Sequence, residues 1–144
     1  MNDIAQVLKN GAEYIFIAGI SYPVFLVSLN RLSVLFSDKI NSQENLDKII
    51  DQEVNKLGIK KVRGIFVNNS IGSAKKIDEQ AKEEYEYELQ IGGGLAKRSV
   101  VRHELYHIYR GHCEINVKNN FAGLLEYLVR ETQASAYGCF GLKI

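Results

Sequence analysis

Two histidines and a glutamate form the most reactive combination of residue types in the sequence, in the run His103-Glu104-Leu105-Tyr106-His107. On a helix, His103 and His107 lie one above the other on the same face, with roughly 5–6 Å between their Cβ atoms. Two imidazoles placed in this way can bind one Zn²⁺ at about 2.0–2.1 Å. Glu104 is rotated by about 100° from His103, so it can reach a water molecule on the metal without binding the metal itself. These residues therefore predict a zinc site in which Glu104 is the general base.

This His-Glu-x-x-His pattern is rare by chance. With average residue usage it should arise in a chain of 144 residues on the order of a few times per thousand. Two of the three histidines in the chain fall into it. The predicted helix that carries it is apolar on two sides, which indicates burial between two layers of structure. An ordinary pair of surface or core histidines is the weaker interpretation.

A catalytic zinc needs a third protein ligand. Glu131 is the preferred candidate, on a second predicted helix 24 residues beyond His107. Glu126 on the same helix competes for this role, but it lies about 140° around the helix axis, so the two glutamates cannot both face the metal. The structural alternatives for Glu131 are an ion pair with Arg130 or Arg102, or simple exposure to solvent.

The second predicted helix also has a packing surface, formed by Leu124, Leu125, Leu128 and Ala134. The small side chains of Ala134 and Ser135 would let this helix approach the first one closely.

His112 offers two other patterns for the third ligand. The segment from His107 to His112 resembles the extended motif of metzincin peptidases, but its glycine lies one place late and its histidine one place early. It also resembles the three-histidine motif of a bacterial ribosomal-RNA endonuclease, again one residue short. Neither spacing fits, and His112 could instead line the cleft. Tyr137 and Tyr109 are candidates for stabilising an oxyanion, although a tyrosine in a packed helix is more often a core residue.

The elements that must position these residues are predicted from hydrophobic periodicity and turn residues. Helices are expected at Asn41–Leu57, Lys97–Arg110 and Asn119–Phe140, with another opening at Pro23, and strands at Tyr14–Ala18, Lys61–Val67 and Tyr85–Ile91. Asn41 and Gly58 are the expected caps of the first of these helices. The charged stretch Ser73–Glu84 is expected to be a solvated helix or loop. This order indicates an α+β fold in a single domain of residues 1–144, with residues 1–40 as an apolar N-terminal part.

The motif followed by Glu131-x-x-Ala134 resembles the gluzincin metallopeptidases, and among them the ImmA/IrrE-type proteins and the minimal single-domain gluzincins. The resemblance covers roughly Tyr85 to Gly138. It implies a zincin-like fold, in which a small mixed sheet packs on the active-site helix and on a second helix that carries the glutamate. It also implies that His103, His107 and Glu131 bind one catalytic zinc ion.

In gluzincins of this kind Glu104 would act as both general base and general acid. The edge strand before the site pairs with an extended peptide, so the resemblance implies that Tyr85–Ile91 binds the substrate by strand addition. Such proteins often cleave cytoplasmic regulatory proteins. The sequence departs from the family at Tyr106, where a small residue is frequent, and its apolar N-terminal part has no counterpart there.

Composition narrows the classes of partner and compartment. The 18 basic and 17 acidic residues give a formal net charge of +1, and no basic stripe with interleaved aromatic residues is present, so nucleic-acid binding is not expected. The two cysteines, Cys113 and Cys139, cannot form a disulfide framework, which favours a reducing, cytoplasmic location. The uncharged run within Tyr14–Phe36 leaves membrane association as the alternative.

These features together predict a zinc-dependent metallopeptidase. The alternative is a catalytically inactive, metal-stabilised module that binds peptides or regulates a partner. Intact Glu104 argues against that alternative, because a binding module has no need of a general base.

Overall fold

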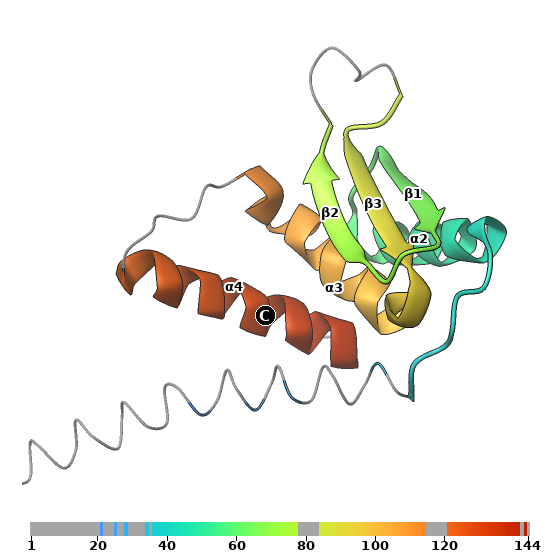
Figure 1. The fold of residues 1–144 in the computed structure, drawn as a ribbon. Helices are drawn as coiled ribbons and strands as arrows, with labels where there is room; N and C mark the ends of the chain where they lie inside the picture. Colours follow the sequence, from blue (N-terminus) through green and yellow to red (C-terminus); the bar gives the residue numbers. More distant parts are fainter. Residues whose placement is uncertain are drawn as a thin grey trace, which may run out of the picture.

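The computed structural model describes residues 36–77, 84–114 and 121–141, together with positions 21, 25, 28, 34 and 143. In this part of the chain the elements are the helices α2 (Gln43–Leu57), α3 (Arg98–Tyr109) and α4 (Phe121–Phe140), the strands β1 (Val62–Val67), β2 (Gly72–Lys76) and β3 (Tyr87–Gly92), and the short 3₁₀ helices η2 (Gly93–Leu95) and η3 (His112–Glu114). The predicted α+β class is confirmed, with helices packed against a small mixed sheet (Figure 1). The predicted strand Tyr14–Ala18 and the helix start at Pro23 lie outside the described residues.

Helix α2 begins and ends at capping residues. The Ser42 side chain accepts a hydrogen bond from the backbone N–H of Asn45 at 3.3 Å, so the N-terminal cap is Ser42 and not the predicted Asn41. At the other end Gly58 has a φ of 74°, and its N–H donates to the carbonyl of Val54, as expected for a C-terminal cap. Four apolar side chains of the helix are buried in the core: Leu46, Ile49, Ile50 and Leu57.

The sheet has the strand order β1-β3-β2, with β1 parallel and β2 antiparallel to β3 (Figure 1). The central strand is therefore β3, and the prediction that Tyr85–Ile91 forms an edge strand is wrong. The edge strand that contacts α3 is β2. It includes Ser73–Lys76, so the prediction of a solvated helix or loop for Ser73–Glu84 is also wrong over these residues.

Lys75 of β2 pairs with a buried glutamate on the central strand. Glu88 on β3 is 5% exposed and pairs with Lys75 of β2 at 3.0 Å and with Arg63 of β1 at 2.6 Å. Burial opposes the ionisation of Glu88, but hydrogen bonds from Gln90, Lys75 and Arg63 outweigh it and lower its pKa to about 2. Lys75 is therefore part of a cross-strand ion pair, although in the sequence it is typical of a solvated segment.

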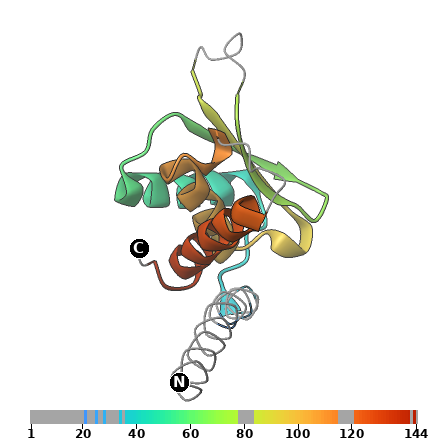
Figure 2. The same cartoon turned by 90° about the vertical axis from the view of Figure 1, so that its left-hand side faces the viewer.

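Helix α3 lies between the sheet and α4 (Figure 1 and Figure 2). Leu89 and Ile91 of the sheet and Val101 and Leu105 of the helix are all 0% exposed. The predicted burial of this helix between two layers is confirmed. It is the central element of the core and the one that carries the His-Glu-x-x-His motif.

Helix α4 packs on α3 through its C-terminal half. Ala134 and Tyr137 are buried, and the Tyr137 ring stacks on that of Tyr106 with centroids 5.3 Å apart. Leu124 and Leu125 are 53% and 47% exposed, so the predicted packing surface is wrong at these two positions. For Leu125 the physical reason is helical phase, since it lies about 180° around the axis from Ala134.

A buried ion cluster joins the three helices at Glu53, which is 1% exposed on α2. Its Oε1 lies 2.6 Å from Arg98, 3.1 Å from Arg102 and 3.0 Å from Lys56. The Tyr137 hydroxyl of α4 donates to its Oε2 at 3.5 Å. Burial opposes ionisation, but the hydrogen bonds from Arg98 and Lys56 and the charge of Arg102 outweigh it and hold the pKa of Glu53 below its ordinary value.

Within the described residues, none of the helices combines the length and the apolar character needed to cross a membrane. The segment Tyr14–Phe36, predicted as the alternative membrane anchor, lies mostly outside those residues.

Replacing Glu53 by Gln should lower the free energy of unfolding by about 3 kcal/mol, because it leaves two arginine charges without their buried counterion. We expect the low end of the range for buried ion pairs, since the arginine side chains remain 25% exposed. Urea unfolding followed by circular dichroism at pH 7 measures the change. The exposed Asp51→Asn on the same helix is the matched control and should shift stability by less than about 0.5 kcal/mol.

The stability difference between wild type and Glu53→Gln also depends on pH, and its direction follows from the pKa of Glu53. The folded-state pKa of Glu53 is lowered, so its contribution is present above the ordinary value of 4.5 and is lost as the pH falls from there through the lower folded-state value. The difference between wild type and Glu53→Gln should shrink over that acid range. Equal stability of the two proteins at pH 7 would contradict a structural role for the cluster.

Candidate metal centre

His103 and His107 lie on one face of α3, as their spacing predicts. Their Nε2 atoms are 3.1 Å apart, and their rings meet edge to face with centroids separated by 4.8 Å. The side chains are only 12% and 13% exposed. Because α3 is held between the sheet and α4, both rings face the space between the helices and not bulk solvent.

Glu131 on α4 supplies a third donor to the same point. Its Oε2 lies 3.4 Å from Nε2 of His103, and its Oε1 lies 3.4 Å from Nε2 of His107. The ligand atoms of the three residues all lie within 4.8 Å of one another, so this group could hold a metal ion. The structure thus brings together the three residues that the sequence predicts as metal ligands.

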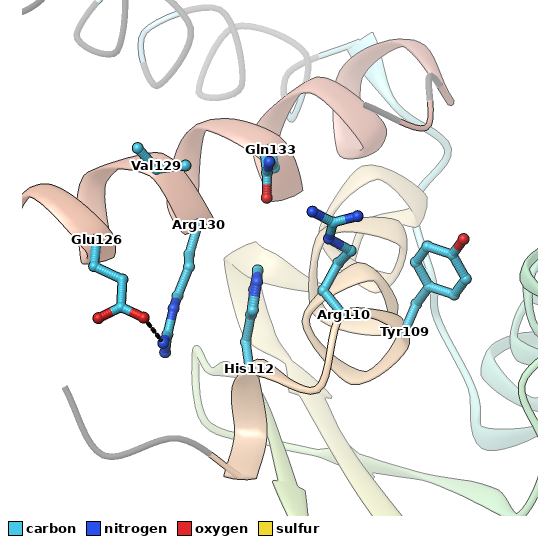
Figure 3. A pocket seen from close by; sticks show the side chains of 7 residues that line it. All are labelled: Tyr109, Arg110, His112, Glu126, Val129, Arg130 and Gln133. Atoms are coloured by element: carbon cyan, nitrogen blue, oxygen red, sulfur yellow. Dashed lines mark hydrogen bonds and ion pairs between the residues drawn. The ribbon is translucent and has the colours of Figure 1, made fainter.

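The side chains that competed for these roles have other partners. Glu126 forms an ion pair with Arg130 on its own helix (Figure 3). Arg102, an alternative partner for Glu131, is bound to Glu53. Glu126 is therefore not part of the ligand group, and Glu131 does not form the predicted ion pairs with Arg130 or Arg102.

The donor separations suit a small tetrahedral ion. Three donors that each bind such an ion at roughly 2.0–2.1 Å lie about 3.3–3.4 Å from one another. The two Nε2 atoms are 3.1 Å apart, and each lies 3.4 Å from a different oxygen of Glu131. With one oxygen of Glu131 as the donor, the three ligand atoms lie within 4.8 Å of one another, so the carboxylate would have to adjust to complete a tetrahedral site.

The protonation states also suit metal binding. Burial and the neighbouring His103 lower the pKa of His107 to about 4, so the imidazole is neutral at pH 7. Burial opposes the ionisation of Glu131, but a hydrogen bond from His103 and electrostatic interactions with the two imidazole rings outweigh it and lower the pKa of Glu131. Neutral imidazole and ionised carboxylate are the forms that bind metals.

Glu104 faces the same cavity without joining the ligand group. The cavity has a volume of about 280 Å³ and is lined by the three ligands, by Glu104 and by residues of β2. Burial raises the pKa of Glu104, and the Glu131 carboxylate raises it further, while the charge of His103 and a hydrogen bond with the Ala74 backbone oppose the shift. The carboxyl group is thus held beside the centre in surroundings that favour proton uptake.

His112 is close to the centre but is not one of its donors. Its Nδ1 lies 2.9 Å from Nδ1 of His107, on the side of that ring opposite to Nε2, the atom near His103 and Glu131. It also lines a second cavity of about 710 Å³, where its ring lies between Arg130 and Arg110 (Figure 3). Burial and the two guanidinium groups lower the pKa of His112. The structure places this residue between the two cavities, which agrees with the prediction that it lines the cleft.

The tyrosines proposed for oxyanion stabilisation lie elsewhere. Tyr137 is 2% exposed, and its hydroxyl contacts Glu53 on the far side of α3 from the ligands. Tyr109 is 40% exposed at the end of α3 and lines the second cavity. The prediction for Tyr137 is wrong in position, because the hydroxyl is drawn to a buried carboxylate.

Strand β2 contributes residues that sequence reasoning missed. A Cβ added at Gly72 would lie 2.6 Å from the Val100 side chain and 3.7 Å from Oε1 of Glu104, so a glycine is needed where β2 approaches α3. The Cys113 thiol donates to the carbonyl of Ala74 at 3.7 Å and lines the same cavity. No local pattern in the sequence could identify these contacts, since they depend on how β2 pairs with the sheet.

Metal analysis tests the ligand set directly. After reconstitution with zinc and desalting, elemental mass spectrometry should find about one zinc ion per wild-type chain. The variants His107→Ala and Glu131→Ala should lose or weaken binding, because each removes a donor. Glu126→Ala, five residues away on the same helix, is the control and should keep the metal. Full retention of zinc in Glu131→Ala would refute the assignment of the third ligand.

Comparison of this chain with protein-family models, with curated proteins and with solved structures finds no match. The functional assignment of the centre therefore depends on the geometry of its own residues.

Proposed function

We propose that this chain is a zinc-dependent metallopeptidase of the gluzincin type. The observation that carries the proposal is the convergence of His103, His107 and Glu131 with Glu104 beside them. Nitrogen and carboxylate donors in a site with three protein ligands suit zinc best among common metals. Three protein ligands also leave one position for a reactant, whereas structural zinc sites are closed by four.

The chemistry divides between the metal and one carboxyl group. A zinc ion in this centre would polarise a peptide carbonyl and lower the pKa of a water molecule to about 7. Glu104 takes the proton of the attacking water and delivers it to the leaving amine. Its burial favours this role, because a raised pKa brings the carboxyl closer to the range in which it can both accept and release a proton.

Strand β2 supports an extended peptide as the substrate. Ile71 accepts a backbone hydrogen bond from Gly92 of β3, and Ile77 donates one to Glu86 just before β3, each at 2.9 Å. Hydrogen-bonded residues alternate along an antiparallel pair, so the backbone groups of Gly72 and Ala74 point away from β3. Those of Ala74 contact the Glu104 carboxyl group and the Cys113 thiol, so Gly72 is the position at which a peptide would pair. Gly72 and Ala74 both line the cavity of the metal centre. We therefore place the peptide along the edge of β2, in place of the predicted Tyr85–Ile91.

The variant Glu104→Gln should keep zinc and lose peptide hydrolysis by at least about 10²-fold, because glutamine fills the same space but cannot accept a proton. Cleavage of an unbiased peptide library, followed by mass spectrometry on proteins loaded with equal zinc, measures the effect. His103→Ala should lose both the metal and turnover.

Two results would count against the peptidase proposal. Hydrolysis at the wild-type rate by Glu104→Gln would remove the assigned general base. A wild-type chain that binds zinc and peptides but cleaves none would favour the inactive, metal-stabilised binding module.

Strand addition at β2 predicts an alternating pattern in the substrate. In a cleaved peptide, alternate backbone N–H groups on one side of the scissile bond would point toward β2, and those of the residues between them would point away. N-methylation of the residues that point toward β2 should lower kcat/KM about tenfold, since each methyl group removes a backbone hydrogen bond to the strand. N-methylation of the intervening residues should have little effect and is the matched control, and equal effects of the two sets would contradict pairing with β2.

A further inference from the structure

The ring of His112 contacts the side of His107 that faces away from the centre. The two Nδ1 atoms are 2.9 Å apart, and the rings are separated by 5.2 Å between centroids with 58° between their planes. The other ring nitrogen of His107, Nε2, is the one near His103 and Glu131. His107 is therefore engaged through both of its ring nitrogens.

The contact would fix the tautomers of both rings once a metal ion binds Nε2 of His107. Two ring nitrogens 2.9 Å apart form a hydrogen bond only if one is a donor and the other an acceptor. If Nε2 of His107 gives its lone pair to a metal, its Nδ1 carries the proton and is the donor. His112 must then accept through Nδ1 and carry its own proton on Nε2.

The position of His112 is set by the fold around it. Helix α3 ends at Tyr109, and Gly111, with a φ of 69°, turns the chain into η3. The next residue, Cys113, connects η3 to β2 through the Ala74 carbonyl. On the opposite side, the His112 ring lies between Arg130 and Arg110 (Figure 3). The ring is thus confined with its Nδ1 directed at His107.

We propose that His112 is a positioning residue of the metal centre, which accepts a hydrogen bond from Nδ1–H of His107. This bond fixes the orientation of the His107 ring and increases the basicity of its Nε2. His112 is then neither the third ligand nor a proton-transfer group. The inference rests on the metal centre of the proposed function, but it does not depend on which reaction that centre catalyses.

Zinc affinity of the full chain, measured by competition with a chromophoric chelator, tests the inference. His112→Ala should lower the affinity about 10–100-fold, because His107 loses its orienting partner. His112→Asn places an amide oxygen at the position of Nδ1 and should restore the affinity to within about threefold of wild type. His112→Gln, whose amide reaches the position of Nε2 instead, is the matched control and should behave like His112→Ala.

The visible spectrum of the Co²⁺-loaded protein is a second measurement, one that a purely structural role of His112 would leave unchanged. The Ala and Gln variants should shift the absorption bands of the bound Co²⁺, whereas the Asn variant should retain them. Thermal unfolding of the metal-free proteins accompanies both measurements. If the Ala variant is unstable, the test is the comparison of the Asn and Gln variants, whose side chains differ by one methylene group.

Equal zinc affinities and Co²⁺ spectra in all four proteins would overturn the inference. Loss of metal in both His112→Ala and His112→Asn to the level of His107→Ala would also overturn it, since His112 would then be a ligand. If the His112 variants show the expected affinities and spectra but the wild-type chain hydrolyses no peptide, only the peptidase proposal is contradicted. A wild-type chain that binds no zinc overturns both.

Discussion

The metal centre depends on the close packing of α4 against α3. The two histidines share one helix and would lie together in many folds, but Glu131 reaches them from a different helix. Ala134 lies one turn beyond Glu131 and is 0% exposed, and Tyr137 stacks on Tyr106 of α3 with centroids 5.3 Å apart. Protein cores are packed so densely that a larger side chain at Ala134 would push the helices apart. The donor separations of 3.4 Å could not then be kept.

The rotation of α3 about its axis matters as much as its distance from α4. Arg98 and Arg102 direct their guanidinium groups to Glu53, whereas His103 and His107 on the same helix face Glu131. A buried ion cluster adds little net stability compared with an apolar core of similar volume, because its charges lose their hydration. The cluster does restrict the rotation of α3 about its axis, since a rotated α3 would leave the Glu53 charge buried without a partner. We infer that the ion cluster on one side of α3 helps to set the direction of the histidines on the other.

The parts of the site that lie on helices follow from local sequence patterns, because helical spacing alone determines which side chains share a face. Tertiary pairing does not follow in the same way. Lys75 makes β2 look solvated, but its partner Glu88 is on the central strand. Tyr137 is in the core because its hydroxyl contacts Glu53, which lies 84 positions away in the chain. His112 follows a glycine turn beyond the end of α3, so no helical periodicity could place it against the ligand. Glu131 is predicted correctly as a neighbour of the histidines across two helices, but these other contacts between elements are not predicted.

The cavity holds two carboxyl groups with opposite protonation tendencies beside the same pair of imidazoles. Burial raises the pKa of Glu104, and the charge of Glu131 raises it further. Burial also opposes the ionisation of Glu131, but the hydrogen bond from His103 and electrostatic interactions with both imidazole rings reverse the balance and lower its pKa. A carboxylate that stays ionised suits metal binding, whereas a carboxyl group with a raised pKa suits proton transfer. The difference arises from position, because Glu131 reaches across from α4 to the histidines while Glu104 faces Ala74 on β2. A centre that only stored or held a metal would need Glu131 and would gain nothing from a buried Glu104, so the pair favours a catalytic role over a purely structural one.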